Sequence, residues 1–147
     1  VSVPIAQRTT PRPVSTQEAA AQPFSGARVL CVDNEDSILV GMASLLSRWG
    51  CKVWTARSRQ ECQALLAETL DPQVVLVDYH LDDGETGTQL MAWLRSQLGE
   101  ELPGVVISAD NRADVLDDVR SLDLDFLNKP VKPAALRALL NRYLKRV

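Results

Sequence analysis

The stretch Val74-Val75-Leu76-Val77-Asp78 places an acidic residue directly after a run of four apolar residues. Such a short apolar run is typical of a strand buried on both faces in a parallel sheet. The pattern recurs, with a polar residue close behind each of three further runs: Asp33 after Val29-Leu30-Cys31-Val32, Ser108 after Val105-Val106-Ile107, and Lys129 after Phe126-Leu127. Because parallel strands deliver their carboxyl ends to one edge of the sheet, we expect these four polar side chains to meet there.

Amphipathic segments of helical length separate the apolar runs and predict five βα units. The expected strands are Arg28–Val32, Lys52–Ala56, Val74–Val77, Val105–Ile107 and Asp125–Asn128. The expected helices run from about Ser37 to Trp49, after Ser58, through Leu90 to Leu98, around Val115, and from Pro133 onward. Right-handed crossovers would then give an α/β fold, a doubly wound five-stranded parallel sheet with helices on both faces.

The sequence marks two of these helices with different clarity. Ser58, with Glu61 three residues later, matches a capping box at a helix start. The helix around Val115 is the weakest of the five predictions, because few apolar residues mark it and Asp114, Asp117 and Asp118 crowd it.

The length, composition and charge of the chain restrict the classes of function that it can have. The 147 residues suit one domain, and the Pro-, Thr-, Ser- and Ala-rich stretch before Ala27 predicts a linker. A net charge of -3 argues against a nucleic-acid partner. Neither a signal peptide nor an apolar stretch of the roughly 20 residues that span a membrane is found, so we expect a cytoplasmic location without direct membrane contact. The three cysteines, Cys31, Cys51 and Cys62, lack the spacing of metal ligands, so we expect them to be reduced structural thiols.

Taken in order, Asp33, Asp78, Ser108-Ala109 and Lys129-Pro130 resemble the receiver domain of two-component response regulators. The resemblance covers 27–147 and leaves 1–26 as a tail. It implies a flavodoxin-like (βα)5 fold and a signalling domain with self-phosphorylation and dephosphorylation chemistry.

The resemblance also implies a role for each residue. Asp78 would accept a phosphoryl group from phosphohistidine with Mg²⁺, and Asp33, Asp78 and the backbone carbonyl of His80 would bind the metal. Lys129, before a cis Pro130, would pair with the phosphoryl oxygens or with Asp78. Ser108, which we expect to face solvent in the unmodified protein, would bind a phosphoryl oxygen and let Phe126 rotate inward.

The chain departs from the family after the first strand, where receivers usually carry two adjacent acids. Asn34 occupies the second acidic position, so we expect weaker Mg²⁺ binding. Asn34 could offer its amide oxygen, or Glu35 could swing in as a substitute ligand, whereas Asp36 suits the start of a helix.

Two positions beside the site suggest a tuning role, because His80 and Asp110 lie two residues beyond Asp78 and Ser108. His80 could orient water, and Asp110 could pair with it. The loop after His80, 81–87, is longer than usual in the family, and Gly84 and Gly87 permit unusual backbone angles there.

Several contexts stay open. Val1–Ile5 resembles the end of a kinase ATPase domain, which favours the C-terminal receiver of a hybrid histidine kinase. The expected partner is a histidine kinase or a histidine phosphotransfer domain. The alternatives are a stand-alone response regulator, a pseudo-receiver that works without phosphate, and a haloacid-dehalogenase-type phosphohydrolase, which would need an Asp where His80 stands. The sequence assigns no oligomeric state.

Overall fold

The computed structural model describes residues 22–144 and contains one parallel sheet of five strands. These are β1 (Arg28–Val32), β2 (Lys52–Ala56), β3 (Val74–Asp78), β4 (Gly104–Ser108) and β5 (Asp125–Asn128), in the order β2-β1-β3-β4-β5. The strands begin and end within a residue of the predicted positions. Because β1 and β3 are neighbours in register, Val32 lies opposite Val77, and the residues that follow each strand meet at one edge.

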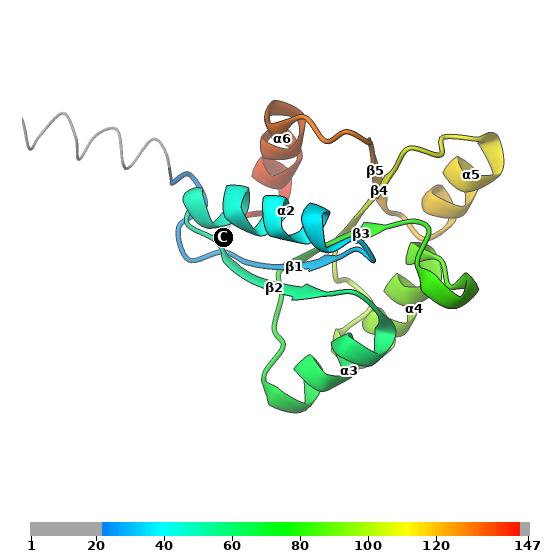
Figure 1. Cartoon of the computed structure of the whole chain (residues 1–147), viewed down its shortest axis with the longest axis horizontal. Helices are drawn as coiled ribbons and strands as arrows, with labels where there is room; N and C mark the ends of the chain where they lie inside the picture. Colours follow the sequence, from blue (N-terminus) through cyan, green and yellow to red (C-terminus); the bar gives the residue numbers. More distant parts are fainter. Residues whose placement is uncertain (1–21, 145–147) are drawn as a thin grey trace, which may run out of the picture.

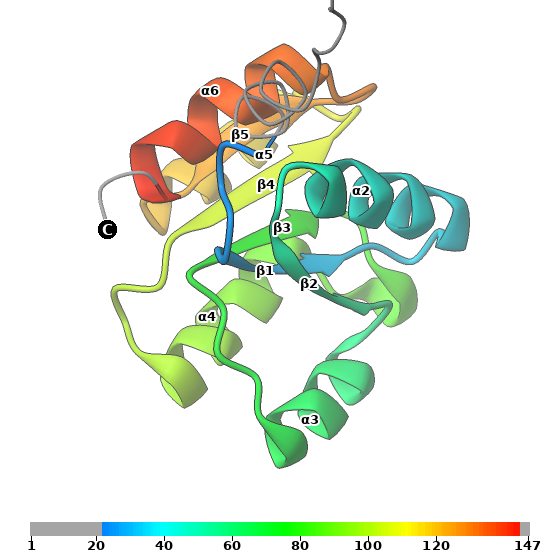
Figure 2. The ribbon, with the colours of Figure 1, turned by 90° about the vertical axis from the view of Figure 1, so that its left-hand side faces the viewer.

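Helices cover both faces of the sheet, as predicted (Figure 1). They are α2 (Asp36–Arg48), α3 (Arg59–Glu68), α4 (Gly87–Leu98), α5 (Ala113–Ser121) and α6 (Pro133–Leu144). The view in Figure 2 shows α2 and α6 on one side of the strands, with α3 and α4 on the other. This arrangement is the expected doubly wound fold.

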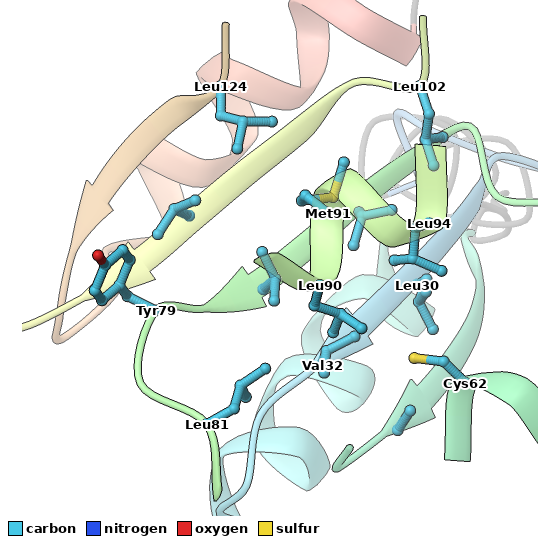
Figure 3. Close-up of a cluster of buried hydrophobic side chains, with 14 of the residues drawn as sticks. Leu30, Val32, Cys62, Tyr79, Leu81, Leu90, Met91, Leu94, Leu102 and Leu124 are labelled. Carbon is cyan, nitrogen blue, oxygen red and sulfur yellow. The ribbon is translucent and has the colours of Figure 1, made fainter. Parts of the chain in front are cut away.

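Each face has its own buried core. Leu39, Leu46, Leu136 and Leu140 pack one face of β1, β3 and β4, on the side of α2 and α6. On the opposite face Leu90, Met91 and Leu94 of α4 pack against β3 and β4, with Tyr79 at the rim (Figure 3). Leu30, Val75 and Val106 are fully buried, which explains why these strands read as continuous apolar runs.

The helix starts show where local signals decide structure. Ser58 caps α3 as predicted, because its side chain accepts a hydrogen bond from the Glu61 N–H. The reciprocal bond of the capping box differs, since the Glu61 carboxylate accepts from the N–H of Arg57 and not from that of Ser58. A complete capping box, which the sequence analysis missed, stands at Thr86 and Gln89 before α4. The predicted weak helix exists as α5, with Val115 and Val119 buried.

The packed chain begins upstream of the boundary expected at Ala27. Phe24 is 3% exposed, its ring packs edge-on against Trp49, and its N–H donates to the Trp49 carbonyl. The end of the predicted linker therefore belongs to the core of the domain. The kinase-like segment Val1–Ile5 lies outside the described residues.

The three cysteines are free and buried, in agreement with the prediction of structural thiols. Burial raises the pKa of Cys51 to about 11 and that of Cys62 to about 12, so neither is a reactive thiolate. Within residues 22–144, no helix is long and apolar enough to cross a membrane.

Candidate functional site

Three charged side chains from three strand ends meet at the carboxyl edge of the sheet. The Lys129 Nζ lies 3.1 Å from Asp33 Oδ2 and 3.2 Å from Asp78 Oδ1. The two carboxylates are almost completely buried, with side-chain exposures of 6% for Asp33 and 9% for Asp78. The peptide between Lys129 and Pro130 is cis, as the resemblance implied. The structure thus brings together three of the predicted site residues.

The charges in this cluster do not balance. Two buried carboxylates share one ammonium group. Burial, followed by the negative charge of Asp33, raises the pKa of Asp78 above its ordinary value despite the nearby Lys129. Burial alone would lower the pKa of Lys129, but its contacts with Asp33 and Asp78 outweigh burial and raise it. The cluster therefore keeps an unneutralised negative charge, which favours a further cation.

The donor atoms at this edge of the sheet are of the kind that Mg²⁺ binds. Mg²⁺ takes one or two carboxylates and keeps several waters, so Asp33 and Asp78 are sufficient acidic ligands. The bonds Gly87 N–H to Tyr79 O and Leu81 N–H to Glu85 O form the bridge between His80 and Thr86, which leaves the His80 carbonyl outside this pairing. No cluster of three or more acidic, His or Cys side chains suited to a metal occurs in the described part of the chain. Two carboxylates and a carbonyl fit Mg²⁺ with water completing its shell.

Ser108 does not face solvent, which corrects the expectation from the sequence. It is 2% exposed, and its Oγ accepts a hydrogen bond from the Asp110 N–H at 3.0 Å. The residue ends a strand whose five residues are all buried. Its hydroxyl lies at the same edge as Asp78 but is already engaged by the loop after β4.

His80 and Asp110 form a pair at the rim. His80 Nε2 lies 2.8 Å from Asp110 Oδ2, and Arg112 binds both oxygens of the same carboxylate, each at 2.9 Å. The hydrogen bonds from Arg112 and then His80 lower the pKa of Asp110 well below its ordinary range. These contacts favour the ionised form of the Asp110 carboxylate.

The residues after Asp33 make contacts that the sequence did not predict. Glu35 is exposed, and it donates its peptide N–H to Asp33 Oδ1 at 2.9 Å, so its backbone supports a carboxylate of the cluster. Asn34 Nδ2 donates instead to Asp82 Oδ1 at 2.9 Å. Asp36, in the first turn of α2, pairs with Arg57 at 3.4 Å.

The loop after β3 contains a feature that sequence reasoning missed. Only Gly84 of its two glycines takes a positive φ, of 74°. Gly87 is needed for a different reason, because a Cβ on it would collide with the Asp78 backbone carbonyl. After the short 3-10 turn η2 (Asp82–Gly84), the start of α4 therefore packs directly against the backbone of Asp78.

Phe126 is half-buried in β5 and packs at the edge of the core on the α4 side. On the opposite face, a groove of about 510 Å³ opens between α2 and the loop after β5. Its apolar lining comprises Ile38, Met42, Leu45, Ala109, Pro130 and Val131. Lys129 also lines this groove, so the groove adjoins the charged cluster.

The sequence matches a known protein family. A sequence profile of the family described as the response regulator receiver domain matches residues 29–141. Comparison with curated proteins gives no significant match.

Solved structures share the fold. The chain is 24% identical to the chemotaxis protein CheY4 of Vibrio cholerae, with a TM-score of 0.73, covering 82% of this chain and 100% of that one. A response regulator receiver protein from Pseudomonas putida is 25% identical, with a TM-score of 0.72 and coverage of 80% and 98%. The receiver domain of a signal transduction histidine kinase from Syntrophus aciditrophicus is 20% identical, with a TM-score of 0.71 and coverage of 83% and 92%.

Proposed function

Because the chain belongs to the response regulator receiver domain family, we propose that it accepts a phosphoryl group from a phosphohistidine onto Asp78, with Mg²⁺, within a two-component phosphorelay. The observation that carries the proposal is the convergence of Asp33, Asp78 and Lys129, with Lys129 Nζ at 3.1 and 3.2 Å from the two carboxylates. The family assignment argues against the phosphohydrolase alternative, as does His80 in place of that family's second Asp.

In the proposed transfer, an Asp78 carboxylate oxygen attacks the phosphorus while the P–N bond to the partner's imidazole breaks. The imidazole nitrogen keeps the electron pair and takes up a proton. Positioning and charge neutralisation supply most of the catalysis in such transfers. Asp78 is held for this step by its place at the end of β3 and by the close approach of Gly87.

Asp33, Asp78 and the His80 carbonyl would hold Mg²⁺, which when bound neutralises charge on the phosphoryl oxygens. Lys129 would move with the transferred charge, because its flexible side chain lets the ammonium group exchange a carboxylate oxygen for a phosphoryl oxygen. After transfer, the Ser108 hydroxyl would donate to a phosphoryl oxygen. That requires its bond with the Asp110 N–H to rearrange, which couples the charge on Asp78 to the loop after β4 and to Phe126.

Phosphotransfer also requires the partner's histidine to reach the rim of the site. We propose that a helix of the histidine kinase or histidine phosphotransfer domain docks in the apolar groove between α2 and the Pro130–Val131 loop. Three observations support this surface: the groove is apolar, it is open, and Lys129 forms part of its wall. A placement at the C-terminus of a hybrid histidine kinase stays a prediction, as does a cytoplasmic location.

The first prediction tests the acceptor. With acetyl phosphate and Mg²⁺, the wild-type chain should gain one phosphoryl group detectable by mass spectrometry, and Asp78→Asn should gain none. Asp36→Asn is the matched control, because Asp36 is an acid near the same edge that pairs with Arg57 and should leave the adduct unchanged. An equal adduct on Asp78→Asn would reject Asp78, and no adduct on the wild type would support a pseudo-receiver.

A further inference from the structure

The acid missing after β1 has a structural counterpart elsewhere in the chain. Asn34 Nδ2 donates to Asp82 Oδ1 at 2.9 Å, although the two residues are 48 positions apart. Asp82 begins the η2 turn in the loop after β3, and this loop leads from Asp78 to α4. A carboxylate from a second loop therefore contacts the residue that stands at the family's second acidic position.

This contact fixes which way the Asn34 amide points. An ionised carboxylate can only accept hydrogen bonds, so the amide must turn its nitrogen towards Asp82. The amide oxygen then points away from Asp82 and is left as a possible neutral ligand for a cation. The negative charge of Asp82 also polarises the amide and increases the electron density on that oxygen.

The neighbouring acids do not offer the same contact. The Glu35 side chain is exposed and makes no capping hydrogen bond, and only its peptide N–H is bound to Asp33. Asp83 is exposed in the same turn as Asp82, with a φ of 61°, and Asn34 donates to Asp82 instead. The contact is therefore specific to one carboxylate of the loop.

We infer that Asp82 is a positioning residue for the metal site: it orients Asn34 so that the amide oxygen faces Mg²⁺, and it supplies the charge that Asn34 lacks. The inference rests on the proposed function, which places Mg²⁺ beside Asp33 and Asp78. Of the two alternatives that the sequence left open, it favours the Asn34 amide oxygen over the Glu35 side chain. Partners that orient a metal ligand typically change affinity by about 10- to 100-fold, and this exposed pair belongs at the low end.

Calorimetric titration of the unphosphorylated chain with MgCl₂ tests the inference without relying on activity. Asp82→Asn should weaken Mg²⁺ binding by about tenfold. Asp83→Asn is the matched control, since it removes the same charge from the same turn but leaves the contact with Asn34; its affinity should change by less than about twofold. The Asn34 side-chain amide signals in NMR should move on adding Mg²⁺ to the wild type and much less in Asp82→Asn. Equal weakening by both substitutions would overturn the inference.

A second background separates orientation from general charge. Asn34→Asp should tighten Mg²⁺ binding, and in that background Asp82→Asn should no longer weaken it, because position 34 then carries its own carboxylate. The same loss from Asp82→Asn in both backgrounds would overturn the inference. A wild-type chain that binds no Mg²⁺ would overturn the metal site of the proposed function itself, which is a distinguishable result.

Discussion

Ser108 Oγ has a partner before any phosphoryl group arrives, because it accepts from the Asp110 N–H at 3.0 Å. The residue is buried, so the amide of Asp110 depends on this hydroxyl for its hydrogen bond. Ser108 thus has two roles in our proposal, one in the resting protein and one after phosphorylation. A switch of partner by one hydroxyl is a local event that can bias the whole loop.

The second prediction follows from this double role. Ser108→Ala should lower the free energy of unfolding by about 1–3 kcal/mol, because it leaves a backbone N–H without its partner. It should also abolish the shift of the Phe126 amide NMR signal on adding beryllofluoride and Mg²⁺. Ser108→Thr, which keeps the hydroxyl, should retain both properties. Unchanged beryllofluoride shifts in Ser108→Ala would contradict the switch.

The third prediction concerns the charge of Asp78. Its folded-state pKa is raised from 3.8, so the folded protein holds this proton more tightly than the unfolded chain does. The ionised group therefore costs stability, and the cost appears as pH rises from about its ordinary value through the raised one. Asp78→Asn should be more stable than wild type at neutral pH, and the gain should shrink in acid. Urea unfolding of both proteins across this range would show it; a gain independent of pH would contradict it.

At the scale of elements, α2 contributes to both the core and the proposed docking surface. Ile38 lines the groove near Lys129, whereas Val40 is 69% exposed and does not line the groove. The same helix thus offers two partly or fully exposed apolar positions with different surroundings. This pair allows a matched test of where the partner binds.

The fourth prediction uses these two positions. Ile38→Glu should slow phosphotransfer from a phosphorylated histidine domain by about tenfold, which corresponds to about 1.4 kcal/mol of lost docking energy. It should leave phosphorylation by acetyl phosphate within about twofold of wild type, because that small donor needs no docking surface. Val40→Glu should affect neither reaction. Equal slowing with both donors would place the defect in the charged site and would contradict docking in the groove.

Sequence reasoning located the strands and the charged cluster because both depend on local signals. Each buried strand is a short apolar run, and parallel strands send Asp33, Asp78 and Lys129 to one edge. The contact between Asn34 and Asp82 was not predictable, because it joins two loops whose shapes are set by tertiary packing.

Helix α5 illustrates the same limit. The sequence marked Asp118 as an unfavourable residue there, but it accepts hydrogen bonds from Tyr79 Oη at 2.9 Å and Thr88 Oγ1 at 2.6 Å. These bonds connect α5 to the end of β3 and to the start of α4. Asp118, which looks unfavourable when α5 is considered alone, therefore stabilises the fold through hydrogen bonds to neighbouring elements.

At the scale of the whole molecule, the domain includes part of its apparent linker. A single aromatic residue in a polar, Pro-rich segment gives no periodic signal, so Phe24 was not recognised as a core residue. Its hydrogen bond to Trp49 and that of Gly26 to Gly50 fasten the segment to the end of α2.

The fifth prediction tests this attachment. Phe24→Ala in the full chain should lower the free energy of unfolding by about 3 kcal/mol, the typical cost of removing a buried aromatic ring. Phe24→Leu, which keeps an apolar side chain, should cost about 1 kcal/mol. Chemical denaturation followed by Trp fluorescence measures both. If the two variants lose no stability, the segment is a linker as the sequence first indicated.

Lys129 and Asp33 are 96 positions apart in the chain. This separation has a consequence for when the site can form during synthesis and folding. Asp33 and Lys129 follow β1 and β5, the first and the last strand in chain order, and they meet beside Asp78 at the carboxyl edge of the sheet. A nascent chain that has not yet added β5 lacks the ammonium group, and a chain with a misplaced β1 lacks a carboxylate. Under the proposed function, phosphoryl transfer to Asp78 would therefore require that β1, β3 and β5 have all taken their places in the sheet.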